Sequence, residues 1–270
     1  MGRDRWKSGT RAGRAWRIIR VAAPALVVAN LAALALRAPA PHPARMAVEA
    51  PAATAASPAT TPTTIPAPQV PPTALLAAPK GTVPTYGSPG GSVTGSVGTW
   101  YGYALVLPVI AQAGGFYQVR LPQRPNGATA WVAAGDVTTS TTPYHITVSL
   151  SAEHLTLYKS GQPVINVPVG IGVPATPTPA GNFFVAVHEL QPERGYGPVV
   201  LDLSAHSETI RSWQGAGDAI IAIHGPIDSY ADSRIGTTGA RLSNGCIRMH
   251  VADLAKLDVI GPGTPVDITA

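Results

Sequence analysis

The stretch Leu242-Ser243-Asn244-Gly245-Cys246-Ile247-Arg248-Met249 carries most of the information in this 270-residue chain. Cys246 is the only cysteine, so it has no partner for an intramolecular disulfide. Small and polar residues precede it, whereas a structural cysteine more often lies within an apolar run. A thiol that follows a glycine, in a chain with a histidine at a predicted strand end, is typical of a nucleophile.

The run Ala219-Ile220-Ile221-Ala222-Ile223-His224-Gly225 supplies the candidate general base. Its apolar residues predict a strand that ends at His224 and projects the imidazole into a cleft. A thiol with a pKa of about 8.5 is only a few per cent thiolate near neutral pH, so it needs a base or an electropositive site. His224 and Cys246 are 22 residues apart, so only tertiary folding can bring them together. We predict that His224 activates Cys246.

Three neighbouring residues complete the site that the sequence predicts. Gly245 allows the backbone to approach a substrate closely, and the amides around Gly245-Cys246 are candidates for an oxyanion hole. Gly225 is expected to leave room for substrate behind the imidazole. Arg248 offers a cationic fork that is suited to a carboxylate.

The net charge of +5 comes from the N-terminus. Residues 1–20 hold seven of the 19 basic residues and one of the 14 acidic residues, so the rest of the chain is close to neutral. A basic tail directly before an apolar run is typical of a membrane-inserted segment. We therefore exclude nucleic acid as a partner.

Residues 1–37 are predicted to be a basic tail followed by a signal peptide or signal anchor. The apolar run from Val21 to Leu36 is long for a signal-peptide core and slightly short for a full span. Ala38-Pro39-Ala40 is a poor cleavage site, because proline occupies its middle and Pro41 follows it. Export from the cytoplasm is expected, and retention at the membrane is favoured over cleavage.

Residues 38–80 consist mainly of alanine, proline and threonine, with almost no charge. Such a stretch cannot bury enough apolar surface to offset its chain entropy, so we expect it to be a disordered linker. Its prolines favour an extended, semi-rigid spacer.

Residues 81–140 are predicted to form a small β-barrel or sandwich. Short strands alternate with turn signals, as in Phe116 to Leu121 and Ala130 to Val132. The arrangement GFYQVRLP followed by ATAWVAAGDV resembles bacterial Src-homology-3-like domains. Tyr117 and Trp131 could line a ligand groove, although core packing is the commoner fate of such aromatic residues.

Residues 144–269 are predicted to fold as a β-rich domain with few short helices. Tyr144 to Leu150 alternates between apolar and polar residues, and Lys159-Ser160-Gly161-Gln162 reads as a hairpin turn. A helix is expected after Met249, with Val251, Leu254 and Ala255 as its apolar stripe. Further strands are expected at 155–158, 164–167, 183–187, 199–203, 219–223 and 265–268. The chain as a whole is therefore predicted to be mainly β.

No metal or cofactor is predicted. The remaining histidines do not pair at metal-ligand spacing and no second cysteine can join them, which leaves a zinc peptidase as a weak alternative. Asp202 and Glu208 are interpreted as solvated or capping groups. The histidines concerned are His42, His145, His154, His188, His206 and His250.

At the cysteine segment the chain resembles the L,D-transpeptidase catalytic-domain family (YkuD-type). That family has a histidine–glycine strand end followed by a Ser-x-Gly-Cys segment, which here are His224-Gly225 and Ser243-Asn244-Gly245-Cys246. The Thr-Pro turn at 176–181 and the opening hairpin at 146–158 also resemble the family. The resemblance covers about residues 144–269. Many members carry a second histidine at the position of Asn244.

The resemblance implies acyl transfer on bacterial peptidoglycan, with no cofactor. Cys246 would attack a tetrapeptide stem, and the resulting thioester would pass to the amine of a second stem in a 3→3 cross-link during cell wall biogenesis. Ser243 would support the cysteine loop, Arg248 would bind a stem carboxylate or brace the loop, and Asn244 and Tyr196 would line the substrate site. The partners implied are stem peptides, the cell wall and the membrane. Carbapenems are expected to acylate Cys246.

Two alternatives stay open at this point. The thioester could be released to water, which would make the protein an L,D-carboxypeptidase, and the sequence does not distinguish the two acceptors. The protein could also be a non-catalytic wall-binding protein, although the presence of Cys246, His224 and Arg248 together disfavours that interpretation.

Overall fold

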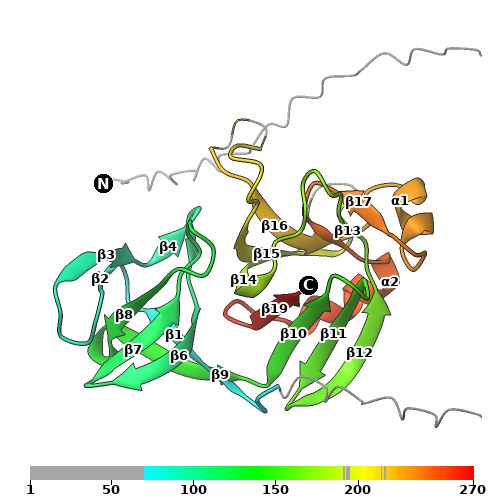
Figure 1. Cartoon of the computed structure of the whole chain (residues 1–270). Coiled ribbons are helices and arrows are strands. Elements are labelled where there is room, and N and C mark those ends of the chain that lie inside the picture. The colour runs from blue at the N-terminus through cyan, green and yellow to red at the C-terminus, as the bar shows by residue number, and fades with distance from the viewer. Residues whose placement is uncertain (1–69, 191, 193–194, 214, 216) are drawn as a thin grey trace, which may run out of the picture. The chain divides into compact units, whose positions relative to one another are not determined.

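The computed structural model describes residues 70–270, except residues 191, 193–194, 214 and 216. The predicted membrane segment (residues 1–37) and most of the predicted linker lie outside the described residues. Within the described part, no helix is long and apolar enough to cross a membrane. The described chain is mainly β with few short helices, as predicted from the sequence (Figure 1).

A seven-stranded sheet contains the strands between residues 74 and 142. Its strand order is β3-β2-β8-β7-β6-β1-β9, and no ladder in this part of the chain joins β3 to β9, so the sheet does not close into a hydrogen-bonded barrel. A two-stranded ribbon and a 3-10 helix complete this region. The elements are β1 (Ala74–Pro79), β2 (Val83–Tyr86), β3 (Val93–Val97), β4 (Thr99–Trp100), β5 (Tyr103–Ala104), β6 (Leu107–Ala113), β7 (Phe116–Arg120), β8 (Thr129–Ala133), η1 (Ala134–Asp136) and β9 (Val137–Thr142).

The end of the predicted linker is an ordered strand, which corrects the expectation of disorder up to residue 80. Residues 74–79 form β1, which pairs with both β6 and β9. Leu76 and Ala77 are buried, so this segment has the apolar surface that the rest of the linker composition lacks. Tyr117 packs against the hydrophobic core of this sheet, as expected for most aromatic residues in such strands.

An eight-stranded sheet contains most strands after residue 143. Its order is β12-β11-β10-β19-β14-β15-β16-β18, and a short parallel pair, β13 with β17, lies outside it. The elements are β10 (Tyr144–Ser149), β11 (His154–Lys159), β12 (Gln162–Pro168), β13 (Ile171–Gly172), β14 (Gly181–Leu190), β15 (Val199–His206), β16 (Ile220–His224), α1 (Ser229–Arg234), β17 (Arg241–Ser243), β18 (Ile247–Arg248), α2 (Val251–Leu254), η2 (Ala255–Val259) and β19 (Pro265–Thr269).

The alternation predicted for the first of these strands is confirmed. Ile146 and Val148 are fully buried in the core, whereas His145 and Thr147 are not. The predicted hairpin turn joins β11 to β12, and Ser160 and Gly161 both have positive φ angles of 51° and 77°. Two successive residues at positive φ match the right-handed twist of the flanking strands.

The helical region after Met249 differs from its prediction. Val251 is half exposed and Ala255 is exposed, so only Leu254 of the predicted stripe is buried. The helix passes into the 3-10 helix η2, in which every third residue lies on the same face. The buried stripe is therefore Leu254, Leu257 and Ile260.

Helix α1 was not predicted because it has no apolar period. Its only buried residue is Ala231, and it begins with a cap in which the Asp228 side chain accepts a hydrogen bond from the Ala231 amide at 2.7 Å. A short exposed helix of this kind depends on its cap and on tertiary contacts more than on a hydrophobic face.

Strand β14 is buried on both faces. Phe183 and Val185 belong to the core of the eight-stranded sheet, whereas Phe184, Ala186 and Val187 pack with the core of the seven-stranded sheet. This explains why the middle of the strand is continuously apolar rather than alternating. The two sheets consequently share a hydrophobic cluster.

Arg124 joins the turn after β7 to the chain segment before β16. Its guanidinium donates to Asp218 Oδ1 from Nε at 3.0 Å and from Nη2 at 2.7 Å, and to the Ser207 carbonyl at 2.7 Å. Asn126 both donates to and accepts from the backbone of His206, at 2.8 and 2.9 Å. Burial alone would raise the pKa of the Asp218 carboxyl, but hydrogen bonds from Arg124 and the Ala219 amide hold that pKa below its usual value.

We expect Arg124→Ala to lower the free energy of unfolding by about 1–3 kcal/mol, because it leaves the half-buried Asp218 carboxylate without its cation. The loss should shrink as the pH falls below 3.8, since a carboxyl with a depressed folded-state pKa contributes stability only above that range. Urea unfolding at several pH values measures both. Arg211→Ala, at an exposed arginine in the same segment, is the matched control and should stay within about 0.5 kcal/mol of wild type. Equal losses of unfolding free energy in the two variants would show that the Arg124–Asp218 interaction does not stabilise the fold.

Candidate active site

Strands β16 and β18 bring His224 and Cys246 to one face of the eight-stranded sheet. The two strands are parallel, with Ile223 opposite Ile247 and His224 opposite Arg248. Both isoleucines are fully buried in the core. Because side chains alternate along a strand, His224, Cys246 and Arg248 point to the opposite face, on strands about 5 Å apart. The tertiary approach that the sequence required is therefore provided by one parallel strand pair.

The imidazole of His224 is held in one tautomer. Nδ1 lies 2.6 Å from the Gly225 carbonyl oxygen. A carbonyl can only accept, so Nδ1 carries the proton and Nε2 is left with a lone pair. Burial, with a smaller effect of the Arg248 charge, lowers the pKa of His224 to about 4 against the opposing effect of the Gly225 hydrogen bond. The ring is neutral near pH 7 and can accept a proton.

The thiol of Cys246 is protonated in the resting protein. The residue is partly exposed, but the close packing around its sulfur raises the thiol pKa, and the charge of Asp202 raises it further. The Ala222 backbone and the Arg248 charge act in the opposite direction. A neutral thiol and a neutral imidazole on one sheet face fit a base that removes the proton as the sulfur attacks, and do not fit a preformed ion pair.

Ser243 and Thr178 fix the loop that carries Cys246. The Ser243 hydroxyl donates to the Cys246 carbonyl at 2.6 Å and accepts from the Gly245 amide at 3.1 Å. Thr178 donates to the Gly245 carbonyl at 2.7 Å and accepts from the Gly172 amide at 2.9 Å. The structure thus places Ser243 where the resemblance implied a supporting role, and adds Thr178 from the Thr-Pro turn.

The close packing around Gly245 explains the need for glycine, but its amide is not available to a substrate. Its φ angle is +120°, and a Cβ there would lie 2.7 Å from Ile221 Cδ1. The Gly245 amide already donates to Ser243, so the expectation that it forms part of an oxyanion hole is wrong for this conformation. Sequence reasoning could not show that a neighbouring hydroxyl occupies it.

Gly225 has a different role from the predicted one. Its amide donates to the Tyr196 carbonyl at 2.7 Å, and a Cβ at this position would lie 2.9 Å from the same oxygen. The space beside Gly225 is therefore filled by backbone and is not left for substrate. The same segment also holds the Tyr196 ring edge-on to the His224 ring, with 4.9 Å between their centroids.

Arg248 and Asn244 flank Cys246 in the sequence. Arg248 Nη1 donates to the Pro226 carbonyl at 3.5 Å, while its Nε is buried without a hydrogen-bond partner among the described residues. Asn244 is exposed, and its side-chain oxygen accepts from Thr176 at 3.3 Å. All eight site residues predicted from the sequence thus lie at the end of β16 or directly after it, on the 195–197 segment that contacts Gly225, or on β17, β18 and the loop between them.

Comparison with known proteins supports the resemblance seen at these residues. The model of the L,D-transpeptidase catalytic domain, YkuD, matches residues 143–268. The putative L,D-transpeptidase YkuD of Bacillus subtilis (strain 168) is 33% identical over 129 residues, which cover 47% of this chain and 67% of that protein. The chain belongs to the L,D-transpeptidase catalytic-domain family.

Other relatives give the same description. A putative L,D-transpeptidase YkuD of Bacillus licheniformis is 33% identical over 130 residues, covering 48% of this chain and 67% of that protein. Among solved structures, an L,D-transpeptidase from Mycobacterium smegmatis is 17% identical with a TM-score of 0.37, and covers 61% of this chain and 90% of that one. The catalytic domain of the E. faecium L,D-transpeptidase is 25% identical with a TM-score of 0.33, and covers 46% and 95%.

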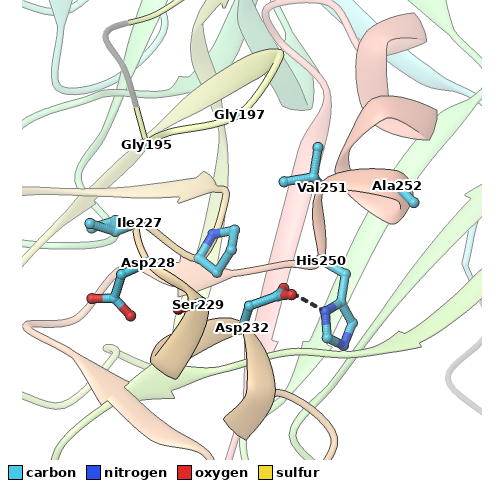
Figure 2. A pocket seen from close by; sticks show the side chains of 10 residues that line it. Gly195, Gly197, Ile227, Asp228, Ser229, Asp232, His250, Val251 and Ala252 are labelled. Carbon is cyan, nitrogen blue, oxygen red and sulfur yellow. Dashed lines mark hydrogen bonds and ion pairs between the residues drawn. The ribbon is translucent and has the colours of Figure 1, made fainter.

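A cavity of about 530 Å³ lies beside the 195–197 segment of the L,D-transpeptidase domain (Figure 2). Pro226, directly after Gly225, is part of its wall, and the Asp232 carboxylate and His250 Nδ1 meet across it at 2.7 Å. The other lining residues are Gly195, Gly197, Ile227, Asp228, Ser229, Val251 and Ala252. Among the described residues, no group of three or more histidine, cysteine, aspartate and glutamate side chains is placed to hold a metal ion.

Asp202 is the ionisable residue that sequence reasoning missed. It was interpreted as solvated or capping, but it lies in the middle of β15 and is mostly buried, and burial with the charge of Glu189 raises its pKa to about 7. Glu208, interpreted in the same way, is exposed. The signal in the sequence was a single carboxylate inside the apolar run Val199 to Leu203.

We expect the imidazole of His224 in the L,D-transpeptidase domain to stay neutral until the pH falls to about 4. NMR titration of histidine-labelled protein, with His224→Gln to assign the signal, measures this midpoint. A midpoint near 6.5, the ordinary value for histidine, would show that burial does not govern the ionisation of His224.

Proposed function

We propose that this protein is a peptidoglycan L,D-transpeptidase that forms 3→3 cross-links through a thioester on Cys246. The observation that carries the proposal is the pairing of β16 with β18, which sets a neutral, tautomer-fixed imidazole and a lone thiol on the same face of one sheet. Membership of the L,D-transpeptidase family supplies the substrate class, stem peptides of the cell wall.

The first half-reaction transfers an acyl group to the enzyme. His224 Nε2 takes the thiol proton as Cys246 Sγ attacks the carbonyl of the L-to-D peptide bond in a tetrapeptide stem. The tetrahedral intermediate then breaks its C–N bond, and the leaving D-alanine amine takes the proton from the imidazolium. The products are free D-alanine and a thioester on Cys246.

The second half-reaction transfers the acyl group to an amine. The side-chain amine of a diamino acid in a second stem attacks the thioester carbonyl, and its proton passes to His224 Nε2. The C–S bond breaks, and the thiolate recovers the proton from the imidazolium. Because Nδ1 is held by Gly225, the same nitrogen serves in both halves.

Other residues bind the substrate and its developing charge. The Gly245 amide is engaged by Ser243, so we assign the oxyanion to the Cys246 amide. Arg248 retains donors beyond its contact with Pro226 and is assigned to a stem carboxylate. Tyr196, against the His224 ring, and the exposed Asn244 are assigned to the walls of the substrate site.

The preceding regions are proposed to place the enzyme. We assign residues 1–37 to export and membrane retention, the following proline-rich segment to a spacer, and residues 81–140, together with β1, to a Src-homology-3-like domain that does not take part in the bond chemistry. The basic N-terminus before an apolar run supports the first assignment. N-terminal sequencing of protein from the membrane fraction tests it, and a mature terminus near residue 41 would contradict retention.

The function is tested by the muropeptides formed from purified tetrapeptide stems. Wild type should release D-alanine and form a 3→3 linked dimer, whereas Cys246→Ala should form neither. His224→Ala should lower the rate by about 10²–10⁴-fold, the range for loss of a general base. Mass spectrometry identifies the products. Release of D-alanine with water as the only acceptor would make the protein an L,D-carboxypeptidase and would refute the cross-linking proposal.

Carbapenems should acylate Cys246, because the β-lactam carbonyl is a strained amide that resembles the bond this thiol attacks. Intact-protein mass spectrometry after incubation with ertapenem should show one added drug mass on wild type and none on Cys246→Ala. His224→Ala should react much more slowly, since its thiol stays protonated near neutral pH. An equal mass gain on Cys246→Ala would place the nucleophile elsewhere.

A further inference from the structure

Asp202 lies in the same cross-strand row as the nucleophile. It pairs with Ala222 on β16 and with Val187 on β14. The β16–β18 register, with Ile223 opposite Ile247, places Cys246 beside Ala222, and the Ala222 backbone contacts the thiol. The row therefore runs from Asp202 through Ala222, whose side chain is a single methyl group, to Cys246.

The Asp202 side chain points to the face of the sheet that carries the thiol. Its chain neighbours Leu201 and Leu203 are fully buried in the core on the other face. Side chains alternate along β15, so Asp202 is on the face of Ala222, His224 and Cys246. The carboxyl group makes no hydrogen bond or ion pair with the described residues, and burial and the Glu189 charge both raise its pKa.

The groups that face Asp202 are acidic or neutral. Glu189 on the neighbouring strand β14 repels its negative charge, and Tyr103 of β5 donates from its hydroxyl to Glu189 Oε1 at 3.3 Å. The Asp202 charge in turn raises the pKa of Tyr103 and of Cys246. The Arg248 guanidinium acts on the thiol in the opposite sense.

We infer that Asp202 is a further residue of the transpeptidase site, which controls the ionisation of the Cys246 thiol from the same cross-strand row, while Glu189 controls the charge on Asp202. Asp202 acts through Cys246 and is a positioning residue in this sense. The inference rests on the proposed function only in taking Cys246 as the nucleophile.

The two carboxylates have opposite effects on the thiol. A charged Asp202 opposes loss of the thiol proton, whereas a protonated Asp202 does not. Glu189 and burial keep Asp202 partly protonated near pH 7, which relieves the thiol of that repulsion. Well above pH 7 Asp202 is charged, and the ionised fraction of the Cys246 thiol is smaller than it would be beside a neutral side chain.

Alkylation of Cys246 by iodoacetamide, followed against pH on the full chain, tests the inference. Asp202→Asn removes the charge with little change in shape, so it should speed alkylation about 3- to 10-fold at pH 8–9, the range for a unit charge at row distance. It should change little at pH 6, where wild-type Asp202 is already mostly protonated.

Glu189→Gln gives the opposite result at the opposite end of the profile. Without the Glu189 charge, Asp202 ionises at lower pH, so alkylation near pH 6.5 should slow about 2- to 5-fold. At pH 9 the rate should equal that of wild type, because Asp202 is charged in both proteins. A purely structural effect of either substitution would change the rate in the same direction at every pH.

Glu208→Gln is the matched control, since this carboxylate follows the same strand but is exposed, and its profile should match wild type. An unchanged profile for Asp202→Asn, or a uniform change for both variants, overturns the inference. If Asp202→Asn does not fold, Glu189→Gln decides alone, and no slowing at pH 6.5 overturns the inference.

Product analysis of the same variants separates this inference from the proposed function. The expected alkylation profiles without any cross-linked product from tetrapeptide stems would support the role of Asp202 and refute cross-linking. Cross-linked product with unchanged alkylation profiles would support the proposed function and refute the role of Asp202.

Discussion

The parallel pairing of β16 with β18 is the constraint on which the active site depends. It is a short ladder, but Ile223 and Ile247 anchor it in the core of the eight-stranded sheet. Because successive side chains alternate between the two faces of a sheet, burial of these two isoleucines directs the neighbouring His224 and Cys246 to the other face. The Arg248 and Gly170 amides and carbonyls exchange hydrogen bonds at 2.8 Å, which closes the free side of β18. The positions of the proposed nucleophile and base are thus set by core packing and backbone pairing.

The chemistry that this arrangement supports is that of two neutral groups. Burial of the imidazole and close packing of the thiol both act against charge separation in the resting protein. The charges that do lie nearby, Arg248 and Asp202, act on the thiol in opposite senses. A nucleophile of this kind is protected from adventitious alkylation and oxidation, because the reactive thiolate forms only when a base removes its proton.

The sequence was sufficient for the features that local pattern determines. Alternation predicted β10, the apolar run predicted β16, and the pair His224 and Cys246 followed from the lone thiol and the strand-end histidine. It failed where a role depends on what lies close in space. The Gly245 amide donates to a hydroxyl two residues away, and Gly225 packs against a carbonyl of the 195–197 segment. The pKa of Asp202 depends on its position between neighbouring strands, one of which carries Glu189. Strand β1 was missed because its composition continues that of the linker, although Leu76 and Ala77 are buried in the structure.

The way in which β1 joins its sheet has a mechanical consequence. Ala74, at the start of β1, pairs directly with Thr142, at the end of β9, and the next strand begins at Tyr144. A pull between the chain before residue 74 and the eight-stranded sheet would therefore act on both strands at the same end. The ladder would open one pair at a time, as a zipper does, and would not resist as a whole in shear. Tension applied to the chain before residue 74 would be released first by peeling β1 away from β9 and β6, before it could reach the strands that hold the thiol.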